Sequence, residues 1–238
     1  MATARFRFFG ELDGFLPRAR RDREFAVPIA RDATVKHMIE ALGVPHTEAG
    51  SLLVNGRQAD FGQLLQEGDQ VLVHPQSAVA QAGIAFIADA HLGGLARLLR
   101  MAGFDTLYDN RYRDEEIAAL ASSKARMVLT RDRELLKRRE VEQGAYLHAL
   151  RPDAQLRELS ARLQLAPLAH PFTRCLECNV LLRPVAKSEV AERLPESVRL
   201  REEAFTTCDA CGRVFWQGSH HRRMLAMLER AIGLESTP

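Results

Sequence analysis

The chain has 238 residues, of which 46% are hydrophobic and 27% charged, with a formal net charge of +2. This is the composition of an ordinary globular protein, and it lacks the ~18 consecutive apolar residues that a membrane span needs. Charge is spread evenly, which excludes a strongly basic segment but leaves a local nucleic-acid-binding patch open. The N-terminus is interrupted by charges and has no apolar core of a signal peptide, so we expect a cytoplasmic protein.

The first 76 residues predict a small domain rich in strands. Alternating or apolar patterns at 3–9, 24–29, 51–54 and 70–74 predict strands, and apolar residues at helical spacing predict a helix over 34–42. This order of two strands, a helix and two strands suggests a β-grasp. The segments VNGR and EGDQVLV resemble the ubiquitin-like sulfur carriers of thiamine and molybdopterin synthesis.

Those carriers act through a free C-terminal diglycine. In this chain the last strand continues into His74-Pro75-Gln76, so we expect a docking or stabilising domain that binds a protein partner. The small, uncharged residues 77–82 are expected to form a linker.

The segment 83–168 alternates strands and helices. We expect strands at 83–88, 104–108, 127–130 and 146–150. Helical patterns occupy 92–102, the residues after Asp114, 132–139 and the residues after Asp153, with the two aspartates as caps. Repeated strand–helix units of this length predict a parallel sheet flanked by helices.

The last segment, 169–238, contains the four cysteines in two pairs of identical spacing. They are Cys175, Cys178, Cys208 and Cys211. Two Cys-x-x-Cys knuckles supply the sulfurs of a tetrahedral structural site, and zinc is favoured over a rubredoxin-like iron. Two disulfides or free thiols are the alternative. We further expect a strand at 214–216 and a closing helix at 222–232.

Acidic residues gather after the strands of the middle segment. Asp89, Asp109 and Asp132 follow the first three strands, Asp114 opens the helix after the second, and Glu134 lies beyond Asp132. The carboxyl ends of parallel strands meet at one sheet edge, where clustered carboxylates suit Mg²⁺ or Mn²⁺. Asp114 and Asp132 have a simpler alternative at helix N-termini and Asp109 as a turn residue, whereas Asp89, directly after an apolar strand, is harder to explain in this way.

Several long motifs together resemble a known family. They are FIADAHLGGLARLLRMAGFDTLYDN, DEEIAALA, RMVLTRDRELLKRR and RCLECNVLLRPV…CDACGRVFWQGSHHRRM. They resemble the Mut7-C RNase family, a PIN-like nuclease domain fused to a zinc ribbon, whose bacterial members often carry an N-terminal β-grasp domain. The resemblance implies a PIN-like domain over 83–168 and a zinc ribbon with a closing helix over 169–238.

PIN-like nucleases hold Mg²⁺ or Mn²⁺ with three or four acidic residues to cleave RNA. By matching motif positions, the resemblance assigns this role to Asp89, Asp114 and Asp132, with Glu134 as a candidate fourth ligand. Asp109 competes with Asp114 for the second position.

Basic and aromatic residues near these motifs are candidate RNA contacts. They are Arg97, Arg100, Arg131, Trp216 and His220. Guanidinium groups can contact phosphates, and aromatic rings can stack on bases. For each arginine an exposed surface role is favoured over RNA contact, and packing around the metal site explains Trp216 equally well.

We therefore expect a metal-dependent ribonuclease with a structural Cys₄ zinc site. The alternative is an RNA-binding or protein-docking adaptor whose acidic edge is vestigial.

Overall fold

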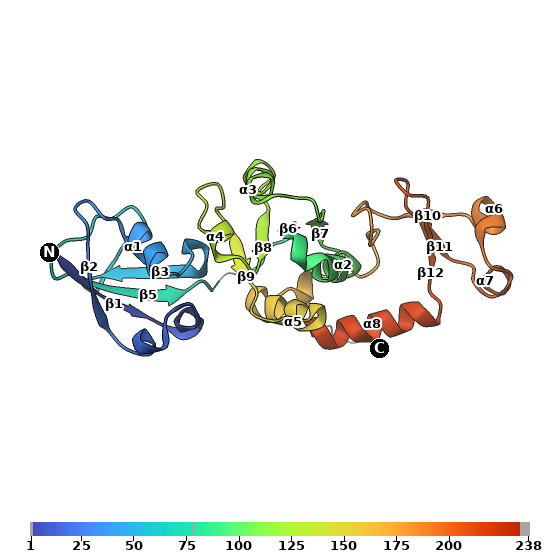
Figure 1. The fold of residues 1–238 in the computed structure, drawn as a ribbon. Coiled ribbons are helices and arrows are strands. Elements are labelled where there is room, and N and C mark those ends of the chain that lie inside the picture. The colour runs from blue at the N-terminus through green and yellow to red at the C-terminus, as the bar shows by residue number, and fades with distance from the viewer. Residues whose placement is uncertain (1, 78, 234–238) are drawn as a thin grey trace. The chain divides into compact units, whose positions relative to one another are not determined.

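The computed structural model describes residues 2–77 and 79–233 (Figure 1). The chain divides into two compact units, one of residues 1–78 with 114–146 and the other of residues 79–113 with 147–238. The division passes through the segment expected to form the PIN-like domain. Each unit is described by itself below.

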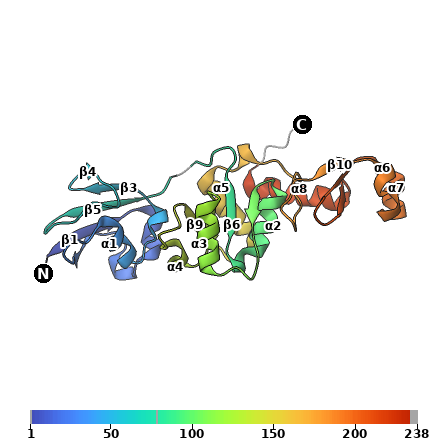
Figure 2. The same cartoon turned by 90° about the horizontal axis from the view of Figure 1, so that it is seen from above.

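The N-terminal part of the first unit is a β-grasp, as predicted. Its elements are β1 (Thr3–Phe8), β2 (Phe25–Pro28), α1 (Val35–Ala41), β3 (Ala49–Val54), β4 (Arg57–Gln58) and β5 (Gln70–Pro75). The strand order is β2-β1-β5-β3-β4, with β1 and β5 parallel, and Figure 2 shows β4, β3, β5 and β1 in sequence. Thr34 caps α1 by accepting a hydrogen bond from the His37 amide. Phe6, Phe8 and Ile39 belong to the buried core.

The rest of the first unit supplies two strands of a second sheet. Its elements are α3 (Asp114–Ser123), β8 (Met127–Thr130), α4 (Arg133–Leu136) and β9 (Gly144–Tyr146). All four residues of β8 are buried, as expected for a parallel strand covered on both faces. β8 and β9 pair in parallel.

The β-grasp contacts this part through a short 3₁₀ helix, His46–Glu48, and through Phe15. The buried Glu48 carboxylate accepts a hydrogen bond from the Tyr146 amide (2.8 Å), and His46 Nε2–H donates to the Val141 carbonyl (3.0 Å). The Tyr146 ring packs edge-on against Phe15, with centroids 5.2 Å apart. These bonds attach the β-grasp to strand β9.

The second unit contains the other two strands of the sheet and the cysteine-containing module. Its elements are β6 (Ala85–Ala88), α2 (Gly93–Met101), β7 (Asp105–Leu107), α5 (Pro152–Leu163), β10 (Arg183–Val185), α6 (Lys187–Val190), α7 (Glu196–Arg201), β11 (Phe205–Thr207), β12 (Val214–Trp216) and α8 (Ser219–Ile232). β6 and β7 pair in parallel, and the four-stranded sheet has the order β7-β6-β8-β9. The fold is thus mixed α/β, with a parallel sheet flanked by helices.

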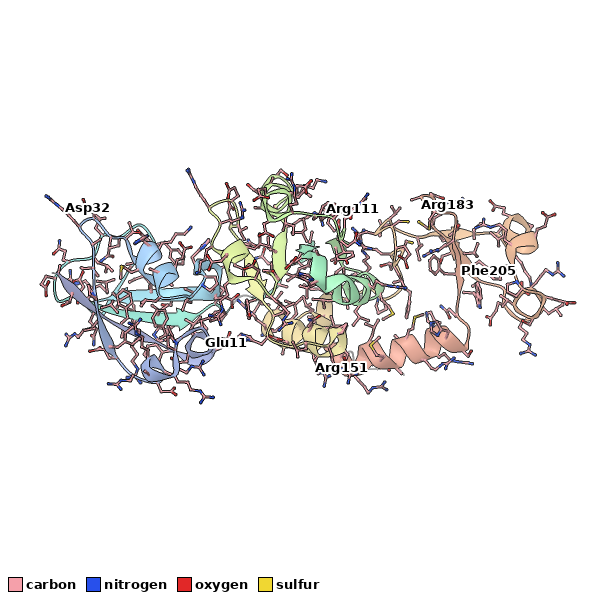
Figure 3. All side chains as sticks on the ribbon, viewed as in Figure 1. Glu11, Asp32, Arg111, Arg151, Arg183 and Phe205 are labelled. Atoms are coloured by element: carbon pink, nitrogen blue, oxygen red, sulfur yellow. The ribbon has the colours of Figure 1, made fainter. Side chains whose placement is uncertain are left out.

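The cysteine-containing module has a three-stranded antiparallel sheet of order β10-β11-β12. Its small core is formed by Val190, Leu194 and Phe205, and Figure 3 marks Phe205 within it. The closing helix α8 packs against α5, where the Ser160 hydroxyl donates to the Ile232 carbonyl (3.3 Å).

The closing helix begins at Ser219, three residues earlier than expected, and three further predicted boundaries were wrong for reasons that the hydrogen bonds and the sequence show. The fourth strand, expected at 146–150, is Gly144–Tyr146, because the amides of residues 148 and 149 bond instead to the Glu158 carboxylate. The helix expected at 132–139 ends at Leu136, since the next amides bond to carbonyls three residues back. The helix after the fourth strand is capped at Arg151 rather than Asp153, with Pro152 in its first turn.

Candidate metal centre and acidic strand ends

The two cysteine pairs form knuckles with the same backbone geometry. The amide that follows each pair bonds to the carbonyl of its first cysteine, from Asn179 to Cys175 (3.0 Å) and from Gly212 to Cys208 (2.7 Å). The amide of that first cysteine bonds to the carbonyl five residues on, at 2.8 and 3.0 Å. Asn179 and Gly212 take positive φ values of 63° and 69°, which asparagine and glycine tolerate best. The two Cys-x-x-Cys segments therefore adopt the same local fold.

The four cysteines are free thiols, and their sulfurs converge. All four Sγ atoms lie within 4.8 Å of one another, and Cys175 and Cys211 are 3.8 Å apart. A tetrahedron of sulfurs with Zn–S bonds of about 2.3 Å has edges of about 3.8 Å. The donor set and its spacing therefore fit a tetrahedral Zn²⁺, and disulfides are not formed.

The clustered thiols shift one another's pKa values when no cation is bound. A hydrogen bond with Cys211, together with burial, raises the pKa of Cys178 to about 12. A hydrogen bond from the Arg213 amide lowers the pKa of Cys211 to about 7. Four thiolates this close repel one another, and a divalent cation offsets that repulsion.

The first knuckle is attached to strand β7. The Asn179 side chain accepts from the Thr106 amide (3.0 Å) and donates to Asp105 (2.7 Å). The Arg174 guanidinium donates to the Gly103 carbonyl (3.1 Å) in the turn that precedes β7. Because Asn179 also shapes the knuckle, one residue joins the metal centre to the sheet.

Arg100 supports the same knuckle from helix α2. Its guanidinium donates to the carbonyls of Thr106 (2.9 Å), Leu176 (3.0 Å) and Glu177 (2.8 Å), and the residue is 5% exposed. Arg100 is one of the residues that the sequence suggests as an RNA contact. Its burial and its bonds to backbone carbonyls indicate a structural role instead.

Asp89 lies at the carboxyl end of the buried strand β6. It is 8% exposed, and it precedes a 3₁₀ helix, Ala90–Leu92, that it does not cap through its side chain. The simplest alternative for this carboxylate, a helix cap, is therefore absent.

Asp109 is engaged by a neighbouring arginine in the loop after β7. The Arg111 side chain donates to both carboxylate oxygens, at 3.0 and 2.9 Å, and its amide adds a third bond at 2.9 Å. These bonds lower the pKa of Asp109 to about 2. Since both oxygens already have donors, Asp109 is the weaker of the two candidates for the second ligand position.

The remaining acidic candidates lie in the first unit. Asp114 is the first residue of α3. Asp132 caps α4, since its Oδ1 accepts from the Glu134 amide (2.8 Å), and the Glu134 carboxylate pairs with Lys137 (2.7 Å) with 77% of its side chain exposed. Asp132 therefore performs the capping role that the sequence also suggested. A cap uses one carboxylate oxygen.

The other candidate RNA contacts lie on exposed or partly exposed surfaces. Arg97 pairs with Glu177 (3.2 Å) with 59% of its side chain exposed, and Arg131 is also exposed. Trp216 and His220 line a groove beside β12 and the start of α8. Phe172 and His221 also line this groove. His221 was expected together with His220 from the sequence, whereas no periodic pattern marked Phe172.

The chain matches two family models along most of its length. The Mut7-C RNAse domain matches residues 84–228, and the Mut7-C ubiquitin domain matches residues 1–81. No curated protein matches. Among the residues described, no helix is both long and apolar enough to cross a membrane.

Solved structures similar to this chain align with about a third of it. The small archaeal modifier protein 1 of H. volcanii is 23% identical, and the match covers 32% of this chain and 98% of that one, with a TM-score of 0.26. A putative molybdopterin converting factor subunit 1 from Pyrococcus furiosus is 19% identical, with the same coverage and TM-score. The Mut7-C RNAse model spans more than half of the chain, and this protein therefore belongs to the Mut7-C RNAse domain family.

Proposed function

We propose that this protein is a metal-dependent ribonuclease that hydrolyses RNA phosphodiester bonds at the carboxyl ends of its parallel strands. The observation that carries the proposal is Asp89, a buried carboxylate directly after a buried strand of a nuclease-family domain, which does not cap the helix that follows. Ligands of open parallel sheets bind at this end of the strands.

Asp89, Asp114 and Asp132 would hold the catalytic ion, with Glu134 as the candidate fourth ligand. Mg²⁺ or Mn²⁺ bound there would lower the pKa of a coordinated water and offset charge that develops on the phosphodiester. Three carboxylates leave coordination positions open for water and phosphate oxygens. The zinc site would be structural, because four cysteines complete its tetrahedron.

Cleavage of a labelled single-stranded RNA by the zinc-loaded protein tests this proposal, with Mn²⁺, with Mg²⁺ and with neither. We expect cleavage that requires the added ion and falls at least ~100-fold in Asp89→Asn and Asp132→Asn. The second variant is informative because asparagine caps a helix as well as aspartate does, so α4 is preserved while the charge is lost. Glu142→Gln, an exposed residue before β9, is the matched control.

Binding of Mn²⁺, followed by electron paramagnetic resonance of the free ion, gives a readout that does not depend on activity. The aspartate variants should lose Mn²⁺ binding while retaining zinc and the circular dichroism of the wild type. Cleavage that survives both substitutions would contradict the proposal. Absence of both cleavage and Mn²⁺ binding in the wild type would favour the adaptor function.

A further inference from the structure

A groove of about 670 Å³ opens between the ribbon strands, the first knuckle and the start of α8. This volume lies within the range of ordinary ligand sites, about 300–1,000 Å³. Ring side chains from three separate segments face it, and they are Phe172, Phe215, Trp216, His220 and His221. Rings presented together from different segments form a surface on which planar groups can stack.

The described residues that line the groove include one cationic side chain, Arg174, and no acidic one. Helix α8 continues from this lining into Arg222 and Arg223. An apolar ligand alone would not require this charge, but a ligand that combines planar rings with phosphates would benefit from it.

The backbone is adapted to present these rings. Phe172 has a φ of +60°, which is rare for a bulky residue, and its amide donates to the Met101 carbonyl (2.9 Å). Its ring lies 4.0 Å from that of His221, and burial lowers the pKa of His221, which favours the neutral imidazole. Strained backbone of this kind is concentrated at binding sites.

Gly218 keeps the chain close to the indole of Trp216. A Cβ at this position would lie 3.0 Å from Trp216 Nε1 and 3.2 Å from Cδ1. Any larger residue would therefore press on the ring. The glycine allows the strand end and the start of α8 to meet around Trp216.

We propose that this groove binds unpaired nucleobases of single-stranded RNA, with little preference for sequence. The proposal rests on the ribonuclease function for the identity of its ligand, but the candidate acidic residues do not line the groove. In a duplex the bases are stacked on one another and cannot enter such a groove, whereas a single strand can place them against aromatic rings. The groove would therefore restrict the enzyme to unpaired segments of RNA.

Trp216 is the single tryptophan of the chain, so its fluorescence reports directly on the groove. The experiment titrates zinc-loaded protein, without Mg²⁺ or Mn²⁺, with a labelled oligouridine, an RNA duplex of equal length and inorganic polyphosphate. Tryptophan quenching and label anisotropy are recorded together. We expect the oligouridine to quench Trp216 and to bind at least ~10-fold more tightly than the duplex.

Phe215→Ala and His220→Ala should weaken oligouridine binding roughly 5- to 150-fold, the range that corresponds to stacking one base. His220 is exposed, so its variant keeps the test valid if Phe215→Ala loses its zinc or fold. Leu200→Ala, 73% exposed on α7 and outside the groove, is the control and should bind as the wild type does.

Equal binding of single strand and duplex, or unchanged affinity in His220→Ala, would overturn the proposal. Quenching by polyphosphate as strong as that by oligouridine would also overturn it, because phosphate rather than base would then be recognised. The ribonuclease proposal is tested separately, since Asp89→Asn should abolish cleavage and bind the oligouridine normally.

Discussion

Arg100 offers the sharpest test of how the metal centre is held. Its guanidinium is almost fully buried and donates to three backbone carbonyls, two in the first knuckle and one in β7. Four thiolates around Zn²⁺ leave a net negative charge, which the nearby guanidinium offsets. Replacement by methionine keeps an apolar stem but removes the charge and all three donors.

We expect Arg100→Met to lower the free energy of unfolding by at least about 1–3 kcal/mol, the cost of leaving a buried carbonyl without its donor, because three carbonyls lose theirs. Supporting residues of this kind typically change metal affinity by about 10- to 100-fold, and zinc affinity should fall accordingly. Arg100→Lys should have a stability and a zinc affinity between those of the wild type and Arg100→Met. Lysine retains the charge but lacks the branched guanidinium that bonds to both the first knuckle and β7.

Urea denaturation followed by circular dichroism measures stability, and competition with a chromophoric chelator measures zinc affinity. Arg97→Met is the matched control, as it lies on the same helix with an exposed ion pair to Glu177, and it should change stability by about 0–1 kcal/mol. Wild-type stability and zinc affinity in Arg100→Met would refute the reasoning.

Three further predictions follow from individual contacts. Gly103→Ala should destabilise the protein by at least about 1–3 kcal/mol, because φ is +96° and a Cβ would lie only 2.3 Å from the His170 carbonyl oxygen. Urea denaturation measures this loss, and unchanged stability would contradict the prediction. Glu48→Ala should cost about 1–3 kcal/mol and speed hydrogen exchange at the Tyr146 amide, whereas Glu48→Gln, which keeps an acceptor, should cost less; equal exchange in both would count against the contact. The Asp109 carboxyl should titrate near pH 2 by NMR, below the 3.8 of an unperturbed carboxyl. Its contribution to stability should therefore be complete above pH 3.8 and be lost as the pH falls through 2. Titration near 3.8 would show that Arg111 does not bind this carboxylate.

Local patterns predicted the elements that local chemistry determines. Thr34 caps α1, the apolar run before Asp89 is strand β6, and the cysteine spacing brings four sulfurs together. Strand β9 was misplaced because its first two residues, Gly144 and Ala145, are poor strand formers. It starts at Gly144, where a Cβ would lie 2.5 Å from the Leu136 side chain, so packing selects a glycine that local propensity disfavours.

Long-range contacts were beyond the reach of sequence patterns. Arg100 occupies an ordinary position on an amphipathic helix, and its role depends on carbonyls 76 and 77 residues away. Glu48 meets its partner, Tyr146, at a separation of 98 residues. Asn179, by contrast, directly follows the first cysteine pair, and the need for a positive φ after each knuckle was a signal available in the sequence.

The central sheet has two edge strands, and each is bonded by a different neighbouring module. At β7, the Thr106 amide is taken by Asn179 of the zinc knuckle, and at β9, the Tyr146 amide is taken by Glu48 of the β-grasp. Unpaired edges of this kind are templates for pairing with other chains. One amide of each edge strand is therefore satisfied within its own unit, and we expect disruption of the zinc knuckle or removal of the first 76 residues to leave that amide open to pairing with another chain.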